Sequence, residues 1–197
     1  MQSGVMRQVR CWAEVAVCFA VLLAMPGCAN EPRSRATNAT ALQGSVRGLA
    51  IGYSLLFDLV DDEQGVDEIL SIKSVSKPTE AIIRRIARVS AQAASELNSL
   101  KNLTPSLQLD DVELPLVEKA TRKSIAVKTA MDLLVSLDSF EVRLLLTQAQ
   151  ALRYGAYLAL ELKSLDSNRK RRHWLESFSK TCGELYDQVV ARLRVAK

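Results

Sequence analysis

The sequence predicts an all-α protein: an antiparallel bundle of four long helices plus one short helix, with one long loop that permits a crossover connection. Residues that break helices are scarce, since the 197 residues include only 8 Gly and 5 Pro. Apolar residues recur at alternating steps of three and four along most of the chain, which is typical of one buried helix face. No stretch alternates apolar and polar residues as a half-buried strand does.

The elements follow in order from local signals. The first helix begins at Ala41 and ends at the polar run that closes with Gly65. A short helix over 66–75 comes next, and a long helix opens at 77–80, where Pro78 and Glu80 suit a first turn. Its end, near residue 100, leads into a crossover loop over 101–114 that contains an acidic patch at 110–113.

Three further helical segments follow, so the local signals give six segments against the five helices of the predicted bundle. Pro115 starts a helix whose stripe is expected to be buried, and this stripe consists of Val117, Ala120, Ser124, Val127, Met131 and Leu134. Asp138 and Glu141 resemble the two ends of a capping box and start a helix that runs to about residue 165. The last helix follows Asn168 and runs almost to the end of the chain.

Three glycines recur every four residues in the first helix, at Gly44, Gly48 and Gly52. Each glycine costs up to about 1 kcal/mol relative to alanine in a helix interior, so three in register suggest that another backbone approaches closely. We predict close packing against a neighbouring helix of the same domain. Dimerisation through this glycine ridge is the alternative, and the oligomeric state stays open.

Two polar residues fall on the apolar side of the helix over 138–165. Winding this helix at 100° per residue places Gln148 toward the core, with Glu141 on the same side. A buried amide needs hydrogen-bond partners, and Ser124 or Thr121 of the preceding helix are candidates. The alternative is a polar spot that recognises a ligand in a core cleft, which would make the protein a small-molecule or lipid-binding bundle.

A basic run opens the last helix: Arg169, Lys170, Arg171 and Arg172, followed by His173. Cations at a helix N-terminus oppose the helix dipole, so the run carries a small local penalty. One interpretation is a solvated turn. The other is contact with an anionic surface, such as lipid head groups or an envelope protein, where each cation is worth up to about 1 kcal/mol.

The N-terminus has the order of a secretory signal peptide, predicted over residues 1–27. Arg7 and Arg10 precede an apolar stretch over 15–25, and small residues follow at Gly27 and Cys28. The stretch is shorter than the roughly 20 residues of a membrane-spanning helix. A core helix that ends at Gly27 is the alternative.

The residues Met25-Pro26-Gly27-Cys28 resemble a bacterial lipobox, in which the cysteine is acylated and becomes the first residue. The resemblance implies attachment to a membrane through lipidated Cys28. With Ala29 next, it also implies an outer-membrane lipoprotein that faces the periplasm. Cleavage after Ala29 is the alternative, and it would give a soluble periplasmic or secreted protein.

After the signal, the sequence predicts a polar tether over 28–40 and a single α-helical domain over 41–197. Cys182 is the one cysteine in this domain and lies in an apolar stripe, so we predict a buried thiol, with a reactive thiol as the alternative. The chain has 26 Lys and Arg against 22 Asp and Glu. This near-neutral balance does not favour nucleic acid as a partner.

No motif specifies a reaction, a cofactor or a metal. The single histidine, His173, cannot supply the two Glu-x-x-His motifs of a di-iron bundle. Haem-attachment, zinc, phosphate-loop and nucleophile-elbow patterns do not occur in the sequence. The sequence therefore predicts a non-catalytic, exported interaction or structural module of the bacterial cell envelope, and leaves its partner unspecified.

Overall fold

The computed structural model describes residues 37–107, 109, 116–135 and 140–196, and every regular element among them is helical. The elements are α2 (Thr37–Glu63), the 3₁₀-helix η1 (Val66–Ser71), α3 (Lys77–Leu100), α4 (Leu116–Val135), α5 (Phe140–Leu165) and α6 (Arg169–Leu193). This architecture confirms the predicted all-α class.

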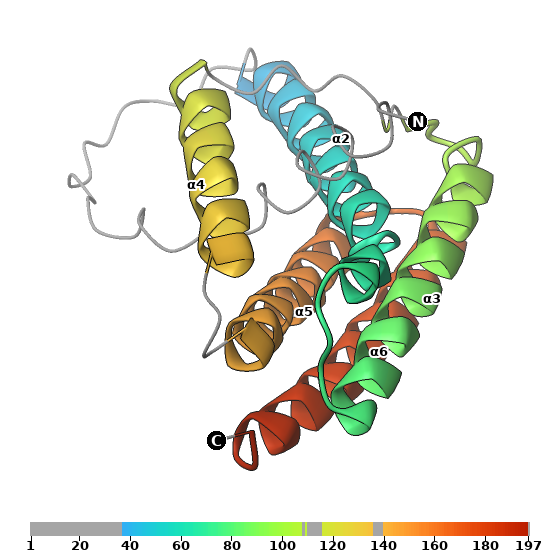
Figure 1. The fold of residues 1–197 in the computed structure, drawn as a ribbon. Coiled ribbons are helices and arrows are strands. Elements are labelled where there is room, and N and C mark those ends of the chain that lie inside the picture. The colour runs from blue at the N-terminus through green and yellow to red at the C-terminus, as the bar shows by residue number, and fades with distance from the viewer. Residues whose placement is uncertain (1–36, 108, 110–115, 136–139, 197) are drawn as a thin grey trace.

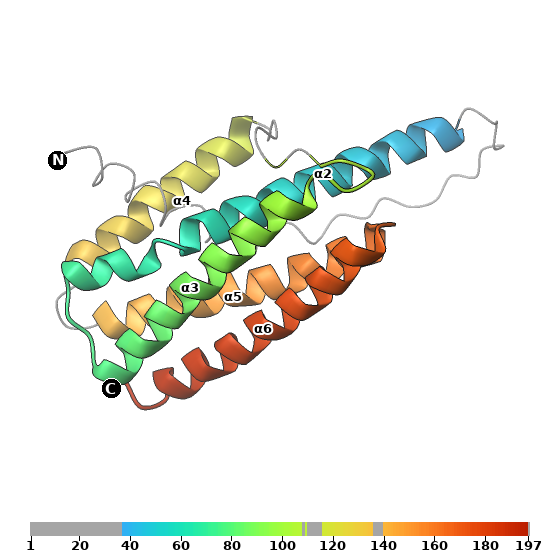
Figure 2. The ribbon, with the colours of Figure 1, turned by 90° about the vertical axis from the view of Figure 1, so that its right-hand side faces the viewer.

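Four of the helices surround the core. α2 packs against α3 and α5, and α6 packs against the same two helices. Helices that follow one another in the chain run in opposite directions (Figure 1, Figure 2). α5 and α6 share the most extensive interface and are joined by only three residues. α4 contacts α5 from outside this group of four (Figure 2).

The interior position predicted for the α4 stripe is wrong for the side chains that the structure describes. These side chains are exposed: Val117, Ala120, Ser124, Val127 and Met131. Leu133 is buried instead, and Ile125 and Thr129 on the same helix face are half-buried. Because α4 carries apolar residues at helical spacing on more than one face, periodicity alone could not identify the buried one.

Most predicted stripes do face the core. On α5, the side predicted to face inward is buried at Leu145, Gln148, Leu152, Gly155 and Ala159. On α2 the buried stripe includes Leu49, Tyr53, Leu56 and Val60. The helix starts also follow the local signals, since Pro78 lies in the first turn of α3 and Asn168 caps α6.

Two boundaries differ from the prediction. α2 begins at Thr37, so the last residues assigned to the tether are helical. Neither Gly nor Pro occurs between 37 and 43, and nothing in the local sequence stops the helix at Ala41. The short helix expected over 66–75 is the 3₁₀-helix Val66–Ser71.

The glycines pack differently from the prediction. Gly48 is exposed, and a Cβ atom built there would meet no atom within 4 Å, so the close packing predicted at Gly48 is wrong. At Gly52 the same Cβ would lie 2.5 Å from Cδ2 of Leu162 on α5. A Cβ atom built at Gly155 on α5 would lie 2.9 Å from Cδ2 of Leu59 on α2.

The close approach therefore belongs to the α2–α5 pair, with one glycine on each helix. Antiparallel packing places a leucine of each helix over a glycine of the other. The α2 ridge cannot do this along its whole length, because successive turns of one helix leave the line of contact with a crossing helix. The surroundings of Gly44 lie outside the described side chains.

The two glycines give a matched pair of variants. Gly48→Leu should raise the free energy of unfolding by up to about 1 kcal/mol, because an exposed glycine in a helix is replaced by a good helix former. Gly52→Leu should lower it by about 1–3 kcal/mol or more, because the new side chain competes with Leu162. Urea denaturation of both variants measures the difference, and equal effects would contradict the assigned contacts.

Candidate functional site

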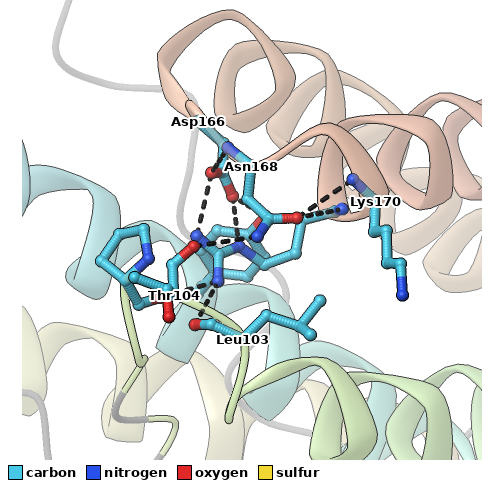
Figure 3. A network of polar contacts seen from close by, with 8 residues as sticks. Leu103, Thr104, Asp166, Asn168 and Lys170 are labelled. Carbon is cyan, nitrogen blue, oxygen red and sulfur yellow. Dashed lines mark hydrogen bonds and ion pairs between the residues drawn. The ribbon is translucent and has the colours of Figure 1, made fainter.

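The most extensive buried polar network surrounds Arg171, in the first turn of α6 (Figure 3). The Arg171 side chain is 0% exposed. Its Nε donates to Oδ2 of Asp166 at 2.5 Å, and its Nη2 donates to Oδ1 at 3.0 Å. Two parallel hydrogen bonds between a guanidinium and a carboxylate form a strong and directional ion pair.

The remaining Arg171 donors hold the segment that follows α3. Nη1 donates to the backbone oxygens of Leu103 and Pro105, at 3.0 and 2.8 Å. The Nδ2 of Asn168 donates to the backbone oxygen of Thr104 at 2.9 Å, while its Oδ1 caps α6 (Figure 3). The turn between α5 and α6 is therefore tied to the α3–α4 connection by side chain-to-backbone hydrogen bonds.

α2 joins the same network through Tyr53. The hydroxyl of this fully buried residue donates to Oδ2 of Asp166 at 2.6 Å, and the Arg171 guanidinium lies 5.8 Å from the ring centre. Burial alone would raise the pKa of Asp166, but the hydrogen bonds from Arg171 and Tyr53 hold it below its usual value. Burial, reinforced by the Asp166 charge, raises the pKa of Tyr53, so the phenol stays protonated as a donor.

The structure thus divides the predicted basic run. The predicted contact with an anionic surface is wrong for Arg171, because this residue is buried. It instead holds three parts of the fold together. Arg169, Lys170 and Arg172 are exposed, as is His173. In the described part of the chain the side chains of these three cations make no hydrogen bond and no ion pair.

Gln148 is 1% exposed, as its position on the apolar side predicts, but its partner is not in α4. It hydrogen-bonds the carboxyl of Glu63, at the last position of α2. Ser124 instead donates to its own helix, at the backbone oxygen of Ala120. The hydrogen-bond partners predicted for Gln148 are therefore wrong, and its partner Glu63 was not among the predicted site residues.

The Glu63–Gln148 pair is incompletely satisfied. Oε2 of Glu63 and Oε1 of Gln148 are buried and have no hydrogen-bond partner among the residues that the structure describes. Burial raises the pKa of Glu63 to about 7, and the hydrogen bond from Gln148 only partly opposes this. Glu63 lines a cavity of about 20 Å³, room for about one water molecule. Ligand sites typically measure about 300 Å³ or more.

Cys182 lines the same cavity and is buried, as predicted. Burial, with the nearby Glu63 charge, raises the pKa of this thiol to about 12. Because the nucleophilic form of cysteine is the thiolate, the observed surroundings favour the predicted inert thiol.

Glu141 lies in the first turn of α5 and is not part of the Glu63–Gln148 pair. Its carboxylate accepts from the Ser76 backbone nitrogen at 3.0 Å and from the Ser76 and Thr79 hydroxyls at 2.7 and 2.5 Å. Arg192 of α6 donates to it at 2.9 Å. Burial acts to raise the pKa of Glu141, but these hydrogen bonds lower it to about 2. Glu141 therefore joins α5 to the start of α3 and the end of α6.

Several predicted features lie outside the described residues. These are the signal peptide, Cys28, most of the tether and the acidic patch over 110–113. Across the described ranges, no group of three or more His, Cys, Asp or Glu side chains could hold a metal ion. None of the helices in those ranges has the length and apolar character to cross a membrane.

Comparison with protein-family models, with curated proteins and with solved structures finds no match to this chain. The candidate sites therefore rest on their own geometry. The exposed cations around Arg171 differ from the other candidate sites, because their side chains make no hydrogen bond or ion pair within the described residues.

Proposed function

We propose that this protein is an exported, lipid-anchored helical bundle of the bacterial cell envelope that acts as a non-catalytic interaction module. The order of basic, apolar and small residues before Cys28 supports export and acylation. Ala29 supports delivery to the outer membrane with the bundle on the periplasmic side. On this proposal the anchored bundle also contacts the anionic membrane surface directly, through its basic end.

The observation that carries the proposal is the set of three unpaired cations around a buried arginine. Arg171 fixes the first turn of α6 through Asp166 and two backbone oxygens. The turn therefore presents Arg169, Lys170 and Arg172 to solvent on a rigid base. Their position at a helix N-terminus costs stability, and no contact in the described fold compensates for it. An anionic surface would supply the missing partner.

The geometry of α2 is compatible with this contact. Tyr53 hydrogen-bonds Asp166 at the basic end, and the residues of α2 that precede it measure about 24 Å along the helix at 1.5 Å per residue. This part of α2 extends past the turn between α5 and α6 (Figure 2). The residues between Cys28 and Thr37 can span at most about 30 Å when fully extended. The tether is thus long enough for the basic end to reach the surface in which Cys28 is anchored.

Vesicle binding tests the proposal. The chain without residues 1–27, produced with an unacylated Cys28, should cosediment with vesicles that contain phosphatidylglycerol and not with neutral phosphatidylcholine vesicles. Each cation near an anionic surface is worth about 1 kcal/mol, so replacing Arg169, Lys170 and Arg172 by Gln should weaken partitioning by up to roughly 100-fold. Added salt should weaken the wild-type interaction as well.

A matched control removes the same charge elsewhere. Arg85, Arg88 and Lys180 are exposed on α3 and α6 and lie away from the first turn of α6. Their replacement by Gln should change partitioning much less. Equal loss in both triple variants would show a general charge effect, and no binding of the wild-type chain to anionic vesicles would reject the membrane contact.

The cavity volume is the reason for preferring an interaction module to the alternative of a small-molecule or lipid carrier near Gln148. The cavity lined by Glu63 has room for about one water molecule, so it offers no space for a lipid chain or a metabolite. The Glu63 oxygen that has no partner among the described residues fits a bound water in this cavity better than an organic ligand.

A further inference from the structure

A groove of about 170 Å³ lies between α3 and α6 and begins one turn along α6 from the basic run. It exists because small residues face one another there: Ala93 on α3, and Ser177 and Thr181 on α6. One wall is aromatic, since the rings of Trp174 and Phe178 stack with centroids 5.2 Å apart and planes 9° from parallel. The groove is too small for a metabolite of ordinary size, but a cavity of about 150 Å³ accommodates a molecule as large as benzene.

A fixed carboxylate stands beside the aromatic wall. Oε2 of Glu96 accepts from the Trp174 indole nitrogen at 2.6 Å, and Oε1 accepts from Nε2 of Gln92 at 2.9 Å. Both donors are neutral, and Glu96 has no ion pair within the described residues. Each carboxylate oxygen has two lone pairs, so acceptor capacity remains on both oxygens. The groove therefore holds an oriented negative charge against an indole ring.

We propose that this groove binds an organic cation, an ammonium or guanidinium group on a short carbon stem. The cation would donate a charge-assisted hydrogen bond to the Glu96 carboxylate, and its stem would lie against the Trp174 ring. The groove volume sets the size to that of one side chain or a small amine. A free amine and a Lys or Arg side chain of a protein partner share this chemistry. The residues that line the groove do not include Arg169, Lys170 or Arg172, so the site is separate from the proposed membrane contact although the two are adjacent on α6.

Trp174 reports on the groove directly. The chain has two tryptophans, Trp12 and Trp174, so a Trp12→Phe background leaves Trp174 as the only indole. In the full chain with this change, butylammonium and butylguanidinium should each produce a saturable change in tryptophan emission. The neutral analogue butanol and equal concentrations of sodium chloride should not.

Variants of the groove separate binding from a nonspecific effect. Glu96→Gln should weaken the cation affinity by at least about tenfold, because the hydrogen bond loses its charge. Glu161→Gln removes the same charge from an exposed position on α5 and should leave the titration unchanged. If Glu96→Gln does not fold, as judged by circular dichroism, the exposed Ser177→Leu fills the groove from α6 and should abolish the response.

Peptides distinguish the two sources of the cation. The peptides Gly-Gly-Lys-Gly and Gly-Gly-Arg-Gly should bind more tightly than the free amines if a protein side chain is the natural occupant, and Gly-Gly-Gln-Gly should not bind. Binding of the free cations but not of the peptides would assign the groove to a small amine. The proposal is rejected by an unsaturable response, by an equal response to butanol, or by unchanged affinity in Glu96→Gln and Ser177→Leu.

Discussion

Replacing Arg171 by methionine should destabilise the protein by about 3–5 kcal/mol, the usual effect of removing one partner of a buried ion pair. Methionine keeps most of the apolar stem, so the loss arises mainly from the partners left behind. The Asp166 carboxylate would stay buried with Tyr53 as its remaining side-chain donor, and the backbone oxygens of Leu103 and Pro105 would lose theirs. Urea denaturation monitored by circular dichroism measures the change.

The adjacent residue provides the control. Arg172→Met removes the same charge one position later, on an exposed side chain, and should change stability by no more than about 0.5 kcal/mol. Arg171→Lys should also be strongly destabilising, because an ammonium cannot reproduce the two parallel hydrogen bonds to Asp166. A loss in Arg171→Met no larger than that in Arg172→Met would contradict the interior role of Arg171.

Glu63 should make the protein less stable as the pH rises through the weakly acidic range. Its pKa is about 7 in the folded state against 4.5 as its ordinary value, so the folded state binds the proton more tightly. The contribution of Glu63 to stability is therefore largest below about pH 4.5, falls until about pH 7 and is constant above that. The total loss from this group is roughly 3 kcal/mol.

Glu63→Gln should remove this slope and raise the free energy of unfolding by roughly 3 kcal/mol at about pH 8, because the neutral amide replaces a buried charge. Denaturant titrations between about pH 5 and pH 8 measure both effects. Glu161→Gln, on an exposed position of α5, should leave the slope in place. A Glu63→Gln variant with the wild-type slope would show that another group titrates.

The contribution of Glu141 to stability has the opposite pH dependence, because it decreases as the pH falls. Its folded-state pKa of about 2 lies below its ordinary 4.5, so the hydrogen bonds from Ser76, Thr79 and Arg192 stabilise the fold above about pH 4.5. This contribution is lost as the pH falls through the range toward 2. The two glutamates therefore place the stability maximum in the mildly acidic range.

The elements that the sequence predicts well depend on local information. The Asn168 cap, Pro78 in the first turn of α3 and the inward side of α5 all follow from residues within a few turns of one another. α4 is the counterexample, because the choice between its apolar faces depends on where α5 lies. Its position is a tertiary property, and no pattern within the helix encodes it.

The burial of Glu63 and Arg171 has a signal in the sequence, because each residue lies at helical spacing from buried apolar residues. Glu63 follows Val60 by three positions and Leu56 by seven, so it continues the buried stripe of α2. Arg171 precedes Leu175 by four positions and Phe178 by seven, and belongs to the buried stripe of α6 in the same way. Helical spacing thus places each charge in the core.

The partners of the buried charges could not be obtained from periodicity. Tyr53 donates to Asp166 across 113 positions, and Arg171 meets backbone oxygens of a connection between two other helices. Such pairs depend on how the helices assemble and not on the spacing within any one of them. Glu141, predicted beside Gln148, is likewise held by residues of α3 and α6.

The three-residue turn between α5 and α6 has a consequence for the order in which the chain folds. Contacts between neighbours in sequence form fastest, so this C-terminal hairpin, with the most extensive interface, is the natural nucleus. Tyr53 and Glu63 of α2 find their buried partners only in segments made much later, at Asp166 in the turn after α5 and at Gln148 on α5. During the proposed export, a chain that is threaded from its N-terminus would lack these partners until α5 and the turn after it had crossed. The topology itself would then delay folding until most of the chain has been translocated.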